Sequence, residues 1–121
     1  MVTASLHNAE LVKSLGATHV IDRKADVVAE ASKIFATPPT FVFDTISEGT
    51  QEIAWKILGT NGVLALVLPP SPKIKAGEDG KTVAVVFGNL HNNVLGRGLF
   101  SHLSKLVEAG KIKVCVFVKV C

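Results

Sequence analysis

Hydrophobic positions along the chain follow two alternating patterns. Short apolar runs rich in β-branched residues are followed by stretches in which apolar residues recur every three or four positions. This alternation is typical of strands joined by crossover helices, so it predicts an α/β fold with one mostly parallel sheet. The predicted strands are residues 2–4, 19–22, 40–45, 63–68, 82–87 and 114–120. The predicted helices are a first one that ends at Gly16, then 25–35, 50–58 and 94–109.

Turn and cap residues support these boundaries. Ser5 or Asn8 is placed to cap the first helix, and Gly16 is placed to end it in the left-handed conformation. The run 63–68 is continuously apolar, as expected for a strand that is buried on both faces. Trp55 lies at helical spacing among apolar residues, which predicts a core anchor.

The candidate site follows from the predicted sheet. Ligands of open parallel sheets bind outside the carboxyl ends of the strands. The residues that follow the predicted strands are therefore the candidates, namely 5–8, 22–24, 44–47, 68–70 and 87–92.

Composition narrows the class of protein. The chain has 121 residues, 48% of them hydrophobic and 19% charged, which indicates one folded domain and argues against disorder. No apolar run approaches the roughly 20 residues that span a bilayer, and residues 1–7 do not resemble a signal peptide. We therefore expect a cytoplasmic protein without membrane contact, in which Cys115 and Cys121 are reduced thiols.

Charge and histidine spacing exclude further classes. The net charge is +3, but residues 1–70 carry five basic and seven acidic groups, whereas residues 71–121 carry eight and three. The lysines of the second half are scattered, and a nucleic-acid surface would need them clustered, so we expect no nucleic-acid partner. The four histidines and two cysteines lack metal-ligand spacing, and no G-x-S-x-G motif is present, so no metal site and no nucleophilic residue is predicted.

Four stretches resemble one family. They are T-A-S, H-N and E-L-V-K-S-L-G-A-T-H-V-I-D within residues 3–22, F-V-F-D at 41–44, L-G-T-N-G-V-L at 58–64, and L-V-E-A-G-K-I-K at 106–113. Together they resemble the cofactor-binding domain of medium-chain dehydrogenases/reductases. The fungal zinc-type alcohol dehydrogenase-like branch, which includes trans-acting enoyl reductases, is the most similar. The resemblance implies a Rossmann-like, doubly wound, mostly parallel sheet. It also implies hydride transfer from NADPH to an enoyl, quinone or carbonyl substrate.

The same resemblance shows which parts of the family pattern are missing. In the family, a first strand and its glycine-rich turn precede the T-A-S stretch, and no G-x-G-x-x-G is present here. The catalytic domain is also missing, and the apolar tail 114–121 departs from the family pattern. We therefore expect residues 1–121 to be an incomplete dinucleotide-binding domain, a fragment that is inactive alone.

Seven candidate cofactor-binding residues come from the resemblance. They are Ser5, Asn8, Arg23, Lys24, Asp44, Ser47 and Leu68. Ser5, Arg23 and Lys24 match positions near the adenosine 2′-phosphate, and a Ser where NAD-specific sites have an acidic residue favours NADPH over NADH. The alternative is that Ser5 only caps a helix and that Arg23 and Lys24 form a polar loop.

The remaining candidates follow later strands. Asp44 and Ser47 match a turn that passes the cofactor ribose, and the alternative is that Asp44 only caps this turn. Leu68, like residues 88–90, matches the approach to the nicotinamide. Neither exit supplies a general acid or base, so no catalytic residue is predicted.

The missing first strand is central in the family's sheet order, which leaves the edges of 2–5 and 41–44 without their partner. Three outcomes are open. The two edges pair directly, the run 114–120 fills the gap, or two chains close it together. The expected partners are therefore the missing catalytic domain or a second copy of the chain. The alternative function is that of a non-catalytic interaction protein that uses the fold as a scaffold.

Overall fold

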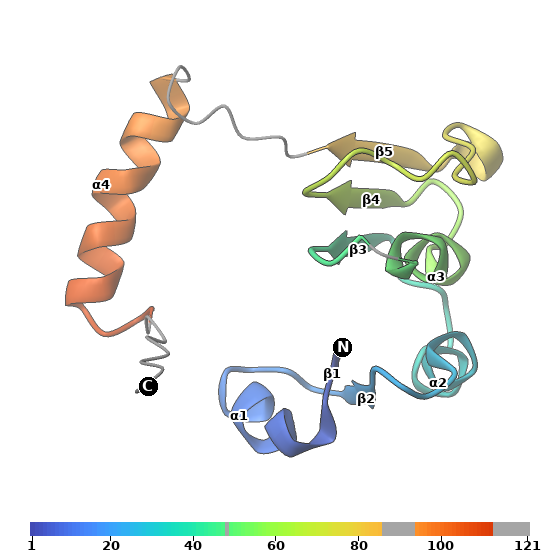
Figure 1. Ribbon diagram of the computed structural model, residues 1–121, viewed down its shortest axis with the longest axis horizontal. Coiled ribbons are helices and arrows are strands. Elements are labelled where there is room, and N and C mark those ends of the chain that lie inside the picture. The colour runs from blue at the N-terminus through green and yellow to red at the C-terminus, as the bar shows by residue number, and fades with distance from the viewer. Residues whose placement is uncertain (48, 86–93, 113–121) are drawn as a thin grey trace, which may run out of the picture. The chain divides into compact units, whose positions relative to one another are not determined.

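The computed structural model describes residues 1–47, 49–85 and 94–112. The chain forms two compact units, residues 1–87 and 88–121. The first unit contains, in chain order, β1 (Val2–Ala4), η1 (Leu6–Asn8), α1 (Ala9–Ser14), β2 (Val20–Asp22), α2 (Val27–Ile34), β3 (Phe41–Asp44), α3 (Thr50–Ile57), β4 (Val63–Leu66), η2 (Glu78–Gly80) and β5 (Thr82–Val85) (Figure 1). The second unit contains α4 (Val94–Glu108). The predicted order of strands and helices is confirmed as far as α4, and the predicted strand 114–120 lies outside the described residues.

All strand pairs in the described part of the chain are parallel. In one sheet β1 pairs with β2, and in the other β4 lies between β3 and β5. The predicted α/β fold with parallel strands joined by helices is thereby confirmed.

Within the described residues the strands form a two-stranded and a three-stranded sheet. Direct pairing of β1 with β3, one of the three open outcomes, is not formed. The two sheets are instead connected through their helices. Ile53 and Ile57 of α3 pack against a buried cluster made by Ile21 of β2 with Val27 and Ala31 of α2.

The core of the three-stranded sheet lies under α3. Leu64 and Leu66 of β4 are fully buried and pack with Ala54 and Leu58. The expectation of a buried strand is confirmed for β4, which ends at Leu66 rather than residue 68. Trp55 packs against this core half-buried, with the Lys81 ammonium 5.3 Å from the centre of its ring.

Helix ends confirm some cap predictions and correct others. The Asp26 carboxylate accepts a hydrogen bond from the Ala29 amide, so α2 begins after Asp26 and not at residue 25. Neither Ser5 nor Asn8 makes a side-chain cap, because a 3₁₀ turn precedes α1 and the Asn8 amide donates to the Ser5 carbonyl oxygen. Gly16 has a φ of 104°, as expected for the residue that ends the first helix.

We predict that Leu64→Ala destabilises the first unit by about 2–5 kcal/mol, because it leaves a cavity in a fully buried position. Urea denaturation followed by circular dichroism measures the change. Leu11→Ala is the matched control, since Leu11 lies in α1 with 56% of its surface exposed. Equal stability of the two variants would contradict the assignment of the core to β4.

Candidate functional site

Parallel pairing brings the predicted strand exits to common sheet edges. The last residue of β1, Ala4, is in register with Asp22, the last residue of β2. In the other sheet Asp44, Leu66 and Val85 end β3, β4 and β5 in register. The candidate residues therefore fall into two groups, one at the end of each sheet.

Ser5 and Arg23 meet at the end of the two-stranded sheet. The Arg23 amide donates to the Ala4 carbonyl oxygen at 3.0 Å, which continues the parallel ladder by one residue. Beyond it, the Arg23 Nε donates to the Ser5 Oγ at 3.1 Å. The structure therefore joins two predicted residues that lie 18 positions apart in the sequence. The two Nη groups of Arg23 have no partner within the part of the chain that the structure describes.

Asn8 and Lys24 lie near this pair in the chain with exposed side chains. The Lys24 amide donates to the Asp22 Oδ1 at 3.0 Å, which shapes the turn after β2. Neither the Asn8 amide group nor the Lys24 ammonium makes a hydrogen bond among the described residues. Three side chains that can donate hydrogen bonds thus follow the ends of β1 and β2: the neutral amide of Asn8 and the cationic groups of Arg23 and Lys24.

Asp44 caps the turn that follows β3. Asp44 is 6% exposed, and its carboxylate accepts hydrogen bonds from the Ile46 amide at 2.8 Å, the Ser47 amide at 3.2 Å and the Thr50 Oγ1 at 2.8 Å. The capping interpretation of Asp44 is therefore confirmed. Contact of this residue with a cofactor ribose stays a prediction.

Ser47 and Leu68 differ in their surroundings. Ser47 has a φ of 78°, and its buried Oγ has no hydrogen-bond partner in the described structure. Leu68 lies two residues beyond β4 with 46% of its surface exposed. The structure brings Ser47 to Asp44, but it shows no contact of Leu68 with another candidate residue. Residues 88–90, the other predicted nicotinamide approach, lie outside the described residues.

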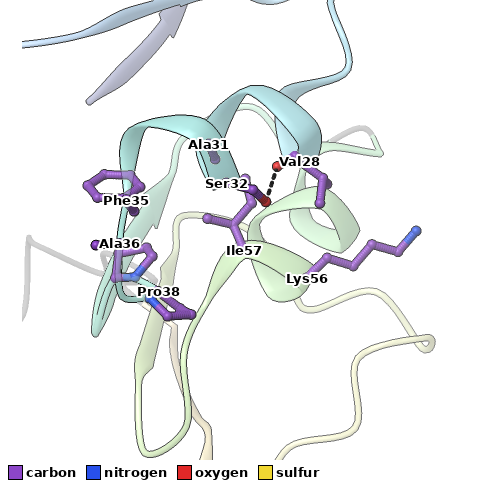
Figure 2. A pocket seen from close by; sticks show the side chains of 9 residues that line it. Val28, Ala31, Ser32, Phe35, Ala36, Pro38, Lys56 and Ile57 are labelled. Carbon is purple, nitrogen blue, oxygen red and sulfur yellow. Dashed lines mark hydrogen bonds between the residues drawn. The ribbon is translucent and has the colours of Figure 1, made fainter.

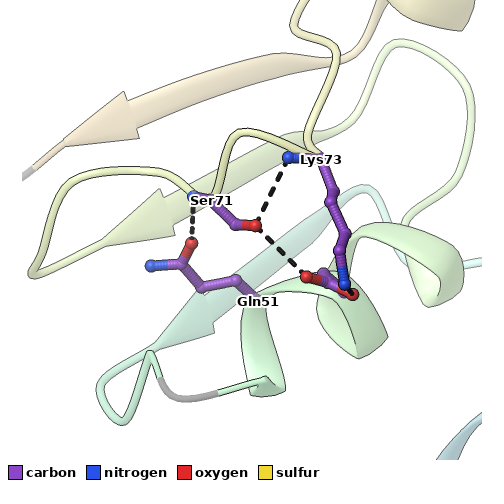
Figure 3. A network of polar contacts seen from close by, with 4 residues as sticks. Gln51, Ser71 and Lys73 are labelled. Carbon is purple, nitrogen blue, oxygen red and sulfur yellow. Dashed lines mark hydrogen bonds and ion pairs between the residues drawn. The ribbon is translucent and has the colours of Figure 1, made fainter.

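Gln51 is a positioning residue that the sequence reasoning missed. Gln51 is 2% exposed, and its side-chain amide donates to the Pro69 carbonyl oxygen. Its Oε1 accepts from the Ser71 amide (Figure 3). The Ser71 Oγ and the Lys73 ammonium both bond to Glu52, the next residue of α3. These bonds hold the segment after β4 against α3. A glutamine in a helical pattern carries no sequence signal of this role.

A surface hollow of about 250 Å³ lies between α2 and α3 (Figure 2). Its walls are mostly apolar, and the Ser32 hydroxyl there donates to the Val28 carbonyl oxygen. None of the seven candidate residues lines it.

The helices in the described part of the chain lack the combination of length and hydropathy that a membrane-spanning helix needs.

The chain is similar in fold to parts of several solved structures. A crystal structure of an alcohol dehydrogenase superfamily protein from Novosphingobium aromaticivorans matches 91% of this chain with a TM-score of 0.74 and 24% identity. The CurK enoyl reductase matches 94% with a TM-score of 0.69 and 19% identity. The human synaptic vesicle membrane protein VAT-1 homolog-like protein matches 93% with a TM-score of 0.64 and 30% identity. No protein-family model matches the sequence, and no curated protein matches it significantly.

This chain has a Rossmann-like fold. Its structural neighbours include an alcohol dehydrogenase superfamily protein, an enoyl reductase and a benzyl alcohol dehydrogenase. The chain spans about a third of the neighbours' length, 36% of the Novosphingobium protein, 37% of the CurK enoyl reductase and 34% of the human protein.

We predict that Asp44→Ala destabilises the first unit by about 1–3 kcal/mol, because two amides and a hydroxyl lose a buried acceptor. Asp44→Asn is the matched control, since its amide oxygen still accepts from the Ile46 and Ser47 amides. Urea unfolding should rank the wild type first, Asp44→Asn second and Asp44→Ala last. A stable Asp44→Ala chain would mean that the turn does not depend on this cap.

Proposed function

We propose that this chain is the cofactor-binding portion of an NADPH-dependent oxidoreductase, and that Ser5 and Arg23 bind the adenosine 2′-phosphate. The observation that carries the proposal is the hydrogen bond from the Arg23 Nε to the Ser5 Oγ across the ends of β1 and β2. This bond orients the guanidinium and uses only its Nε–H donor. The Nη groups keep the donors that a phosphate accepts in a bidentate manner.

The chemistry of this group fits a phosphate better than a ribose hydroxyl. NAD-specific sites place a carboxylate after the second strand of the fold to accept from the ribose 2′-hydroxyl. By the resemblance, β1 of this chain matches that second strand, so Ser5 stands where such sites have the carboxylate. Arg23 and Lys24 follow β2 and bring two positive charges. A 2′-phosphate carries the negative charge that these side chains attract. NADPH is therefore the proposed cofactor, and no metal is included.

The other candidates are proposed to orient the rest of the cofactor. Asn8 is proposed to support the adenosine end, Asp44 and Ser47 to border the ribose, and Leu68 to offer apolar surface to the nicotinamide. NADPH supplies the hydride when bound, and these side chains bind and orient. We propose reduction of an enoyl, quinone or carbonyl group, in the cytoplasm, for the assembly of this chain with a catalytic domain.

We predict that NADPH binds the purified chain saturably. Arg23→Glu should weaken this binding by about tenfold or more, because the attraction between the guanidinium and the 2′-phosphate becomes a repulsion between two negative charges. Isothermal titration calorimetry measures both affinities, after size-exclusion chromatography has shown a single species. NADH should bind more weakly than NADPH to the wild type, and this preference for NADPH should be lost in Arg23→Glu.

Lys33→Glu is the matched control, since it makes the same change of charge in α2, where Lys33 pairs with Glu30 on the surface. Its NADPH affinity should equal that of the wild type. A flat titration of a folded, monodisperse chain would exclude the cofactor function for this chain. Equal loss of affinity in both variants would exclude the assignment to Arg23.

A second candidate function is that of a non-catalytic interaction protein. The favouring observation is the exposure of apolar residues on β3, where Phe41 and Phe43 are 61% and 54% exposed. Concentration-dependent self-association without nucleotide affinity would support this function. Saturable NADPH binding by a monomer would favour the cofactor-binding function.

A further inference from the structure

The segment between β4 and η2, residues 67–77, contains turns and bends but no helix or strand. Hydrogen bonds attach it to two neighbouring side chains of α3, Gln51 and Glu52 (Figure 3). Gln51 is buried, whereas the Glu52 side chain keeps 33% of its surface exposed. The attachment therefore has a buried neutral part and a more exposed charged part.

Ser71 lies at the charged part of this attachment. Its Oγ donates to the Glu52 Oε1 at 3.2 Å and accepts from the Lys73 amide at 3.4 Å. The Lys73 ammonium bonds to the Glu52 Oε2 at 3.2 Å. One carboxylate thus holds one hydroxyl and one ammonium, and its charge is balanced by that of Lys73. A charged group added to the Ser71 Oγ would disturb this balance directly.

The sequence around Ser71 is that of a kinase substrate. Pro69 and Pro70 precede it and Pro72 follows it. Proline-directed kinases require proline directly after the acceptor, a residue without an N–H group, and one class of them favours a second proline two positions before it. Proline also keeps the residue before it extended, as binding in a kinase cleft needs. The three prolines are exposed and Ser71 is half-buried, so a limited local opening presents its hydroxyl.

We propose that Ser71 is a phosphorylation site for a proline-directed serine/threonine kinase, and that the phosphate detaches residues 69–73 from α3. In the transfer, the Ser71 Oγ bonds to the γ-phosphorus of ATP, the bond from this phosphorus to the β–γ bridging oxygen breaks, and ADP leaves. The hydroxyl proton goes to the catalytic aspartate of the kinase. This modification goes beyond the proposed cofactor function and does not depend on it.

Charge determines the direction of the change. A phosphate brings about 1.5 to 2 negative charges at pH 7 and offers no donor to Glu52. The single ammonium of Lys73 cannot balance both the phosphate and the carboxylate. Glu52 is fixed in the first turn of α3, so the repulsion displaces the segment. The Ser71 amide then leaves the Gln51 Oε1, whereas Ile74, which packs against the core, marks the end of the detached part.

Treatment of the folded full-length chain with ATP and a recombinant mitogen-activated protein kinase tests the modification. Peptide mass spectrometry should locate a phosphate on Ser71, and that phosphate should be absent from Ser71→Ala. Thr37 is the internal comparison, since it is exposed and precedes Pro38, but Phe35 stands two positions before it. More phosphate on Ser71 than on Thr37 would support the proposal. Equal or greater phosphate on Thr37 would overturn it, as would phosphorylation of a synthetic peptide of residues 67–77 but not of the folded chain.

Hydrogen–deuterium exchange of the phosphorylated chain tests the detachment. Peptides that cover residues 69–73 should exchange about tenfold faster after phosphorylation, whereas peptides from β4 should not change. Glu52→Gln is the matched variant, because its side-chain oxygen still accepts from the Ser71 Oγ but carries no charge. Phosphorylation should accelerate exchange much less in this variant. No acceleration in the wild type, or equal acceleration in both chains, would overturn the detachment. Since no NADPH is used, the result is independent of the NADPH titration.

Discussion

Packing between α2 and α3 holds the two sheets of the first unit together. Ile53 and Ile57 of α3 contact the cluster of Ile21, Val27 and Ala31, whereas no backbone pairing joins the sheets. A two-stranded parallel sheet is not stable by itself, so β1 and β2 depend on this helix contact. The same contact places the Ser5 and Arg23 pair in one folded unit with the Asp44 turn.

The sequence was sufficient to predict the elements and the proximity of Ser5 and Arg23. The spacing of apolar residues and the positions of turn residues are local signals. The strands, the helices and their order therefore follow from them as far as α4. Parallel order then predicts that residues after β1 and β2 share an edge. The bond between Arg23 and Ser5, 18 positions apart, is the direct result of that register.

The parts that sequence reasoning missed or left open depend on contacts without a local signal. The separation into two sheets depends on whether one strand edge finds another, which periodicity does not report. Ser5 and Asn8 are good capping residue types, but the intervening 3₁₀ turn moves the helix start away from them. Gln51 acquires its role only because the chain after β4 returns to α3. Each outcome is decided by tertiary packing.

The proposed cofactor site depends on charge at one of its ends. Arg23 and Lys24 follow β2 with exposed side chains, whereas the Asp44 carboxylate already accepts from the Ile46 and Ser47 amides and the Thr50 hydroxyl. The sequence also contains no G-x-G-x-x-G turn for the pyrophosphate. Affinity would then rest mainly on the adenosine end. Under that condition the charge of the 2′-phosphate, rather than the pyrophosphate, decides whether a nucleotide binds.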